Sequence, residues 1–202
     1  SHLQHLAGRR EAVRAIKSVL VANRGEIAAR ILRTVKQLGM RGIVVYHAQD
    51  EGSPALALAD DAIRIEGETP VAAYLNAGAI VEAARRAQAD AIHPGYGFLS
   101  ENAAFARVIE DAGLLFVGPR PETIELLGDK IRARAFVAER GFPVAPSAIE
   151  DEDPATFAER ARRLGAPLLV KPAAGGGGKG MRIVRDMDVL DEELERARSE
   201  GK

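Results

Sequence analysis

The sequence predicts an α/β protein in which an open parallel sheet is followed by the start of a small α+β domain. Two observations lead to this fold class. Short apolar runs alternate with helical patterns through residues 18–119, which is typical of parallel strands joined by helical crossovers. After residue 141, a strand, a glycine-rich loop and a second strand follow one another directly, which predicts a hairpin.

The first domain is predicted to span residues 18–119. Its strands are short apolar runs without polar alternation, as expected for strands buried on both faces. We place these strands at residues 19–22, 42–46, 62–65, 91–92 and 114–117. The helices between them are placed at residues 27–38, 54–60, 76–88 and 100–111.

Apolar spacing and capping residues define these helices. The first helix has apolar residues spaced by four, four and three positions, at Ile27, Ile31, Val35 and Leu38. Asn76 and Ser100 are side chains that accept hydrogen bonds from a first helical turn, and we expect each to cap the helix that follows it. Glycines are expected to end the first and the last of these helices.

The second half of the chain has a different pattern. Two helices, at residues 121–127 and 129–140, are predicted to form a connector over residues 120–140. A glycine and two prolines then break the chain, and a smaller domain is predicted over residues 141–202. It contains a helix starting at Asp153–Pro154, two strands at 168–171 and 181–184, and a last helix from residue 188.

Composition excludes several classes of partner and site. The chain has 202 residues, with 28 basic and 29 acidic side chains and a net charge of −1. Proteins that bind the nucleic-acid backbone usually carry a basic excess, so we expect no nucleic-acid partner. No apolar run reaches the roughly 18–20 residues of a membrane span, so we expect no membrane partner. Residues 1–17, with four basic side chains and one acidic, are predicted to form an N-terminal tail.

The sequence contains no cysteine. Disulfides, cysteine-ligated zinc and thiol nucleophiles are therefore excluded, and a reducing compartment is consistent with this composition. We expect a cytoplasmic protein, or one of the mitochondrial matrix if the source is eukaryotic.

The glycine-rich loop at residues 174–180 (AGGGGKG) is the strongest chemical signal. Four consecutive glycines are costly to order, and successive free backbone N–H groups can form a nest that binds an anion. Lys179 and the preceding Lys171 add positive charge, so we predict a phosphate chain as ligand, with a disordered hairpin tip as the alternative. A P-loop or dinucleotide fingerprint would continue into a helix, whereas a strand follows here.

Two further motifs lie where sheet strands end. The turn at residues 23–26 (NRGE) has one glycine where a dinucleotide site has three, so we expect Arg24 and Glu26 to cap and salt-link the helix start. Residues 93–102 (HPGYGFLSEN) follow a strand at the edge where such sheets bind ligands. His93 and Glu101 could supply acid–base chemistry there, or His93 could be a structural histidine. No second histidine is near in sequence, so no metal site is predicted.

The segment Gly128–Lys130 opens a helix. A lysine in the first turn is unfavourable against the helix dipole, and a bound phosphate would reverse that balance. The alternative for Lys130 is a solvated surface lysine.

Four blocks, at residues 21–28, 93–102, 128–130 and 171–181, together identify a resemblance. In their order and spacing the chain resembles the N-terminal part of biotin carboxylase, the ATP-grasp component of acyl-CoA carboxylases and pyruvate carboxylase. The resemblance runs from about Ser18 to the end. The loop that begins with Ala174 looks closest to that of acyl-CoA carboxylase alpha subunits.

The resemblance implies a fold and a set of site residues. A Rossmann-like open parallel sheet (the pre-ATP-grasp domain) would be followed by the start of a small α+β ATP-grasp lid domain, left incomplete at residues 141–202. Lys130 and Lys171 would contact ATP, and Gly177 and Gly178 would lie over its phosphates. The magnesium ligands and the catalytic residues would lie further along the chain, so the resemblance assigns neither within these 202 residues.

The same resemblance implies the reaction and its partners. ATP and Mg²⁺ would serve the carboxylation of carrier-bound biotin by bicarbonate, through a carboxyphosphate intermediate. A biotin carboxyl carrier domain and a carboxyltransferase would be the partners, with a possible homodimer in the full-length enzyme. The isolated chain is expected to be inactive. Pyruvate carboxylase, urea carboxylase and a non-catalytic nucleotide-binding module are the alternatives, and the missing dinucleotide fingerprint speaks against the last of these.

Overall fold

The structure is a computed structural model that describes residues 15–172 and 180–200. The chain divides after Gly128 into two compact units. None of the described helices is long and apolar enough to cross a membrane.

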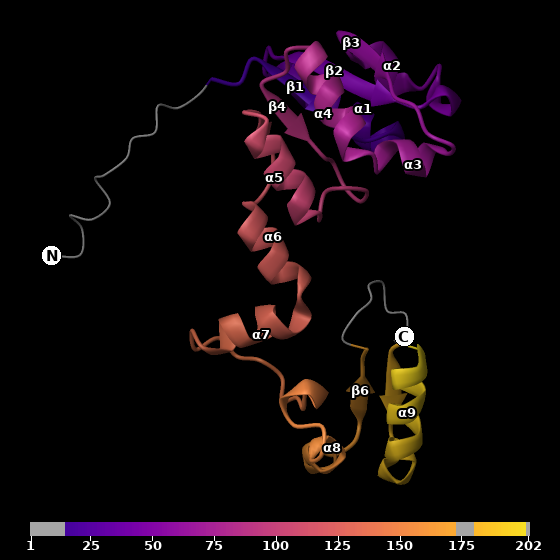
Figure 1. Ribbon diagram of the computed structural model, residues 1–202, viewed down its shortest axis with the longest axis vertical. Coiled ribbons are helices and arrows are strands. Elements are labelled where there is room, and N and C mark those ends of the chain that lie inside the picture. The colour runs from indigo at the N-terminus through magenta and orange to yellow at the C-terminus, as the bar shows by residue number, and fades with distance from the viewer. Residues whose placement is uncertain (1–14, 173–179, 201–202) are drawn as a thin grey trace, which may run out of the picture. The chain divides into compact units, whose positions relative to one another are not determined.

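The first unit is built on a five-stranded parallel sheet, as the sequence predicts (Figure 1). Its strands are β1 (Ser18–Val21), β2 (Arg41–Tyr46), β3 (Asp61–Arg64), β4 (Ala91–His93) and β5 (Leu115–Phe116). They lie in the order β3-β2-β1-β4-β5, and each neighbouring pair is parallel. β1 is central, with Leu20 opposite both Ile43 and Ile92.

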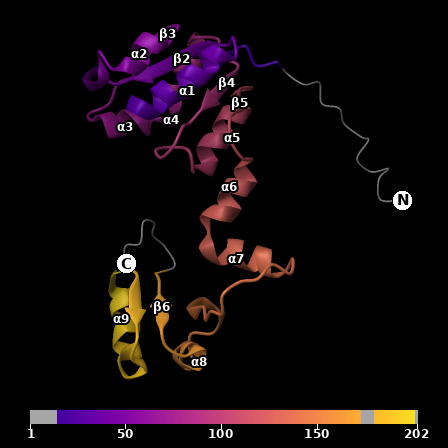
Figure 2. The ribbon, with the colours of Figure 1, turned by 180° about the vertical axis from the view of Figure 1, so that it is seen from behind.

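Helices cover both faces of this sheet. They are α1 (Gly25–Gln37), α2 (Pro54–Leu58), α3 (Pro70–Tyr74), α4 (Ala77–Arg86) and α5 (Ala103–Asp111), with a 3₁₀ turn at Ala48–Asp50. The last helix of the unit, α6 (Pro121–Gly128), contacts α5. Side chains alternate along a strand, so Val21 packs with α1 and α2 on one face. Leu20 packs with α3, α4 and α5 on the other face. Figure 2 shows α5 beside β5 at the edge of the sheet.

The buried face of α1 agrees with the predicted one at Val35 and differs from it elsewhere. Leu38 is 68% exposed, and Ile27 is only partly buried. The buried positions of this helix are Ala28, Ala29, Leu32 and Val35. Alanines let the helix approach the sheet closely, and the spacing of the larger apolar residues alone did not reveal this face.

Two helix starts in the first unit also differ from expectation. Asn102, not Ser100, caps α5, because its Oδ1 accepts a hydrogen bond from the Phe105 amide at 2.8 Å. Ser100 belongs instead to a turn that precedes the helix. The short helix α3 was not predicted, although Thr69 caps it and Pro70 occupies its first turn.

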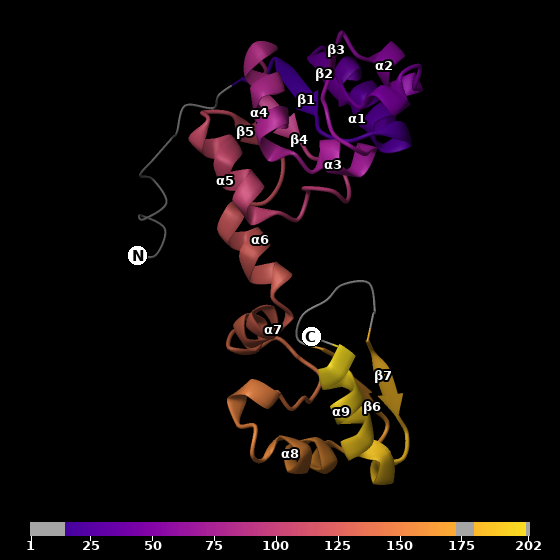
Figure 3. The ribbon, with the colours of Figure 1, turned by 45° about the vertical axis from the view of Figure 1, so that its right-hand side comes forward.

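The second unit contains a two-stranded sheet with helices beside it. Its elements are α7 (Lys130–Ala138), a 3₁₀ turn at Glu150–Glu152, α8 (Phe157–Leu164), β6 (Leu168–Val170), β7 (Arg182–Val184), a 3₁₀ turn at Met187–Val189 and α9 (Leu190–Glu200). β6 and β7 pair antiparallel, which confirms the predicted hairpin pairing, and α9 lies against them (Figure 3).

A small core holds the second unit together. It consists of Ala161, Val184, Leu190 and Leu194, contributed by α8, β7 and α9. The helix expected from Asp153 begins later, at Phe157. Asp153 uses its side chain in a preceding turn, where it accepts a hydrogen bond from the Thr156 hydroxyl at 2.6 Å.

Candidate functional site

The carboxyl edge of the first sheet is the natural place for a ligand. The chain runs outward from β1 to β2 and β3 on one side, and β4 and β5 lie on the other. Open α/β sheets bind ligands at the point where the strand order reverses in this way. In this unit the point lies between the turn after β1 and the loop after β4.

Asn23 fills that point. Its side chain is fully buried, and Nδ2 donates hydrogen bonds to the carbonyls of Pro94 at 2.9 Å and Tyr96 at 2.8 Å. Oδ1 accepts a hydrogen bond from the Arg24 amide at 2.9 Å. A Cβ on Gly95 would come within 2.6 Å of the Asn23 Nδ2. The loop can therefore approach Asn23 this closely only because residue 95 is glycine. The turn after β1 is therefore bonded directly to the loop after β4 at this edge of the sheet.

Arg24 pairs with Asp50 rather than capping α1. Its side chain makes no capping hydrogen bond, and its Nε donates to the Asp50 Oδ1 at 3.1 Å. The Arg24 Nη2 pairs with the same oxygen. This hydrogen bond raises the pKa of Arg24 above its ordinary value, so the guanidinium stays charged. The expected salt link at the helix start is thus replaced by a longer-range pair.

Asp50 also binds Tyr74. The Tyr74 hydroxyl donates to the Asp50 Oδ2 at 2.8 Å and accepts from the His47 amide at 3.3 Å. Burial and, next, the hydrogen bond to Asp50 raise the pKa of Tyr74, so the hydroxyl stays a neutral donor. Asp50 and Tyr74 were not predicted from the sequence, because they lie far from Arg24 in the chain and match no short motif.

His93 holds the loop after β4. Its Nδ1 accepts a hydrogen bond from the Gly95 amide at 3.0 Å, and burial lowers the pKa of the imidazole. Glu101 is exposed, and no hydrogen bond joins it to His93 in the part of the chain that the structure describes. The geometry therefore favours the structural role for His93.

The predicted phosphate contacts lie in the second unit. Lys130 is the first residue of α7 and is exposed, and the preceding Asp129 caps that helix through bonds from two amides. Lys171 is exposed and directly follows β6, at the loop end of the hairpin. The lysines therefore stand on separate elements of this unit. Gly177, Gly178 and Lys179 lie outside the described residues.

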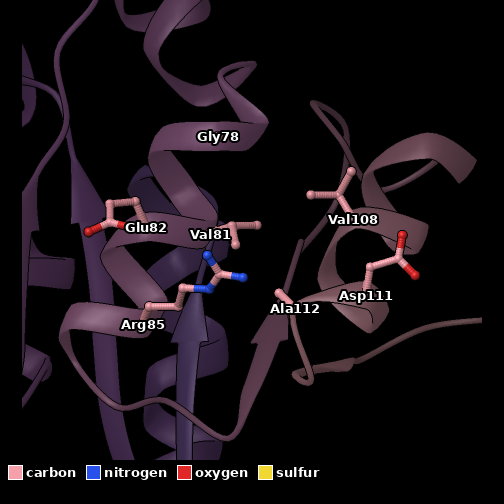
Figure 4. Close-up of a pocket in the computed structure, with 7 residues that line it drawn as sticks. All are labelled: Gly78, Val81, Glu82, Arg85, Val108, Asp111 and Ala112. Atoms are coloured by element: carbon pink, nitrogen blue, oxygen red, sulfur yellow. The ribbon is translucent and has the colours of Figure 1, made fainter.

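A cleft of about 350 Å³ lies between α4 and α5 (Figure 4). Val81 and Val108 line it, and the Arg85 guanidinium points into the gap. Its lining runs along α4 from Gly78 to Arg85 and along the carboxyl end of α5 from Val108 to Ala112. Asn23 and the loop residues that it binds are not part of this lining.

A family model for the biotin carboxylase N-terminal domain matches residues 15–124. The chain belongs to the biotin carboxylase family. A second model, the ATP-binding domain of the carbamoyl-phosphate synthase L chain, matches residues 129–202. The two matches meet near the point where the structure divides into two units.

Curated relatives come from several biotin-dependent carboxylases. The chain is 43% identical to the biotin carboxylase of Haemophilus influenzae over 189 residues, covering 93% of this chain and 42% of the relative. It is 45% identical to the pyruvate carboxylase of Bacillus subtilis over 193 residues, or 93% of this chain and 17% of the relative. It is 46% identical to the mitochondrial methylcrotonoyl-CoA carboxylase subunit alpha of Glycine max, covering 92% of this chain and 26% of the relative. The chain thus spans less than half the length of these relatives.

Solved biotin carboxylase structures share the fold. One is the biotin carboxylase domain dimer of the Hydrogenobacter thermophilus 2-oxoglutarate carboxylase, in complex with MgADP, ADP and bicarbonate. It is 42% identical with a TM-score of 0.82, and the match covers 93% of this chain and 41% of that one. Members of the family are ATP-dependent ligases, and the α/β fold predicted from the sequence is confirmed.

Proposed function

We propose that this chain is the N-terminal portion of a biotin carboxylase, which carboxylates biotin with bicarbonate at the expense of ATP. The observation that carries the proposal is the order of the two family matches on one chain, the N-terminal domain first and the ATP-binding domain second. On this proposal residues 18–119 are the biotin carboxylase N-terminal domain and residues 120–140 a helical connector. Residues 141–202 are the start of the lid.

In this proposal the second unit binds the phosphates of ATP. Lys130 and Lys171 supply positive charge, and the amides of Gly177 and Gly178 donate hydrogen bonds. When bound, ATP supplies the phosphoryl group that activates bicarbonate. Fixed cations and amides would stabilise the charge that develops during phosphoryl transfer. The exposure of both lysines leaves them accessible to such a ligand.

Magnesium is not assigned to the described residues. Among them, no group of three or more histidine, aspartate or glutamate side chains lies close enough to hold a metal ion. We propose, as the family resemblance of the sequence implies, that the ligands of the Mg²⁺ that accompanies ATP, and the catalytic residues, come from outside this chain.

The proposed setting is a biotin-dependent acyl-CoA carboxylase, with a biotin carboxyl carrier domain and a carboxyltransferase as partners. The form of the loop that begins at Ala174 supports this type. Pyruvate carboxylase stays the alternative, because relatives of both types are similar to this chain at almost the same identity. Pairing of two carboxylase subunits is part of the proposal, since a related domain is described as a dimer.

A nucleotide titration tests the proposed site. We expect ATP to shift the amide NMR signals of Gly177 and Gly178, and Lys130→Ala and Lys171→Ala each to weaken binding about tenfold, as loss of one charged hydrogen bond does. Lys36→Ala is the matched control, because it removes an exposed lysine from α1 in the other unit. Equal affinity of all four proteins would refute the site.

Two further measurements separate the alternatives. NADH is expected to leave the amide NMR spectrum of the chain unchanged, because the turn at residues 23–26 lacks the dinucleotide fingerprint and Asn23 is bonded to the loop after β4. NADH binding at the carboxyl edge of the sheet would instead support a nucleotide-binding module. Biotin-dependent ATP hydrolysis by the pure 202-residue chain would contradict the proposal that catalysis needs residues outside it.

A further inference from the structure

One residue of the loop after β4, Phe98, has a backbone conformation that its residue type does not favour. Gly95 and Gly97 have φ angles of 68° and 69°, and Phe98 has a φ of 45°. An aromatic residue rarely adopts this left-handed conformation, and such strain persists only where the surroundings impose it. Something outside the loop must therefore hold it.

The first set of contacts that fixes the loop comes from the turn after β1. The buried Asn23 amide donates to the carbonyls of Pro94 and Tyr96 and so fixes the backbone on both sides of Gly95. Tyr96 nevertheless keeps its side chain 78% exposed. The first part of the loop thus has a fixed backbone and a free aromatic ring at the ligand edge of the sheet.

The second contact that fixes the loop comes from α3. The rings of Phe98 and Tyr74 lie 5.4 Å apart with an interplanar angle of 42°, and in Figure 1 the loop after β4 passes beside α3. Tyr74 is 1% exposed, and its hydroxyl is held by Asp50. The strained residue of the loop therefore packs against a ring that is itself fixed.

Both sets of contacts depend on the turn after β1. Asp50 is held by Arg24, whose Cζ also lies 5.8 Å from the centre of the Tyr74 ring. Asn23 and Arg24 are adjacent, so one dipeptide anchors the loop directly through an amide and indirectly through Asp50 and Tyr74. In a dinucleotide-binding unit this turn would hold phosphates instead.

We propose that Arg24, Asp50 and Tyr74 form a positioning group that fixes residues 94–99, the segment presented at the ligand edge of the sheet, for the reaction of the full-length enzyme. The proposal rests on the proposed function for the reaction it serves, but the positioning can be measured without it. These three residues are positioning residues, because they act through the loop. Through this group the anchored segment presents its exposed Tyr96 ring at the edge where open α/β sheets bind ligands.

A fluorine NMR spectrum tests the positioning in the 202-residue chain. The sequence has three tyrosines, at positions 46, 74 and 96, so 3-fluorotyrosine labelling gives three signals. Tyr74→Phe keeps the ring beside Phe98 and removes the hydroxyl that Asp50 holds. We expect the Tyr96 signal to shift and sharpen as the loop is released, and the Tyr46 signal to stay in place. An unchanged Tyr96 signal would overturn the proposal.

Amide exchange distinguishes a released loop from a weaker protein. The Ser100 amide donates to the Gly97 carbonyl across Phe98, and the Leu20 amide lies in the central strand. In Tyr74→Phe we expect Ser100 to exchange about five- to tenfold faster, as loss of one hydrogen bond implies, with Leu20 unchanged. Equal acceleration at both amides means general destabilisation and overturns the positioning role. Tyr46→Phe, which removes a half-buried hydroxyl from β2, is the matched control.

Kinetics connect the loop to the reaction. In an active biotin carboxylase that contains this sequence, we expect Tyr74→Phe to raise the KM of one substrate about three- to tenfold and to change kcat less than twofold. Unchanged KM values despite a released loop would overturn the role in the reaction. If the unmodified enzyme shows no biotin-dependent ATP use, the proposed function fails, while the fluorine and exchange results still decide the positioning.

Discussion

Gly95 marks the closest approach between the two segments that meet at the carboxyl edge. Both Gly95 and Gly113 have positive φ angles, of 68° and 75°, but only at Gly95 would a Cβ meet another group, the Asn23 amide. Gly113→Ala should therefore cost about 1 kcal/mol, for the left-handed backbone alone. Gly95→Ala should cost about 3 kcal/mol, because steric overlap adds to the same backbone term. Urea unfolding of the two variants measures the difference, and equal losses would contradict the close approach.

His93 gives the stability of the first unit a dependence on pH. Burial lowers its pKa below the ordinary 6.5, so the folded chain keeps the imidazole neutral when the unfolded chain already binds a proton. Its stabilising contribution is complete above the unfolded pKa. It is lost as pH falls from about 6.5 towards the lowered folded pKa.

We expect His93→Asn to flatten this part of the pH dependence, because asparagine can still accept a hydrogen bond and does not titrate. Urea midpoints at about pH 7.5 and about pH 5.5 test it, across the range in which an ordinary histidine changes charge. Gly113→Ala is the control and should keep the slope of the unmodified chain. If the urea midpoint of His93→Asn changed with pH as much as that of the unmodified chain, another group would be the cause of the pH dependence.

At the scale of the element, the cap of α5 can be tested directly. The Asn102 Oδ1 accepts a hydrogen bond from the Phe105 amide at 2.8 Å, whereas Ser100 lies in the preceding turn. Asn102→Ala should cost about 1 kcal/mol, the usual effect of losing a capping side chain. Ser100→Ala should change stability by less than about 0.5 kcal/mol, as an uninvolved surface substitution does. Thermal unfolding of both variants decides the point, and a larger loss for Ser100→Ala would restore the sequence prediction.

The elements show which features of the fold a sequence can reveal. The strands β1 and β2 were predictable because a continuous apolar run has few alternatives when it is flanked by turn residues. The inward face of α1 was not, because Ala28 and Ala29 are small and only packing distinguishes a buried alanine from an exposed one. The helix α3 was missed because five residues are too short for an apolar period to show.

The site divides in the same way. The turn at Asn23 and the loop after His93 could be singled out because consecutive residues carry their signals. Their contact through the Asn23 amide could not be predicted, because no strand order was predicted. The group of Arg24, Asp50 and Tyr74 could not be predicted, because its members are 26 and 24 residues apart. Only the folded chain brings them together.

At the scale of the whole molecule, two cores predict two unfolding transitions. The first unit has a large core on both sides of its sheet, and the second depends on the cluster around Val184, Leu190 and Leu194. Each cluster is contained within one of the two compact units. Separate cores of this kind are the usual basis of separate folding units.

Leu190→Ala and Leu32→Ala are matched changes that test this division. Both leucines are buried, at 0% and 1% exposure, one in each unit. Loss of a buried leucine costs about 2–5 kcal/mol, enough to unfold a unit with the smaller core. We expect Leu190→Ala to abolish amide protection in β6 and β7 while β1 and β2 keep theirs, and Leu32→Ala to weaken protection only in the first sheet. Loss of protection in β1 on changing Leu190 would show instead that the two units unfold as one.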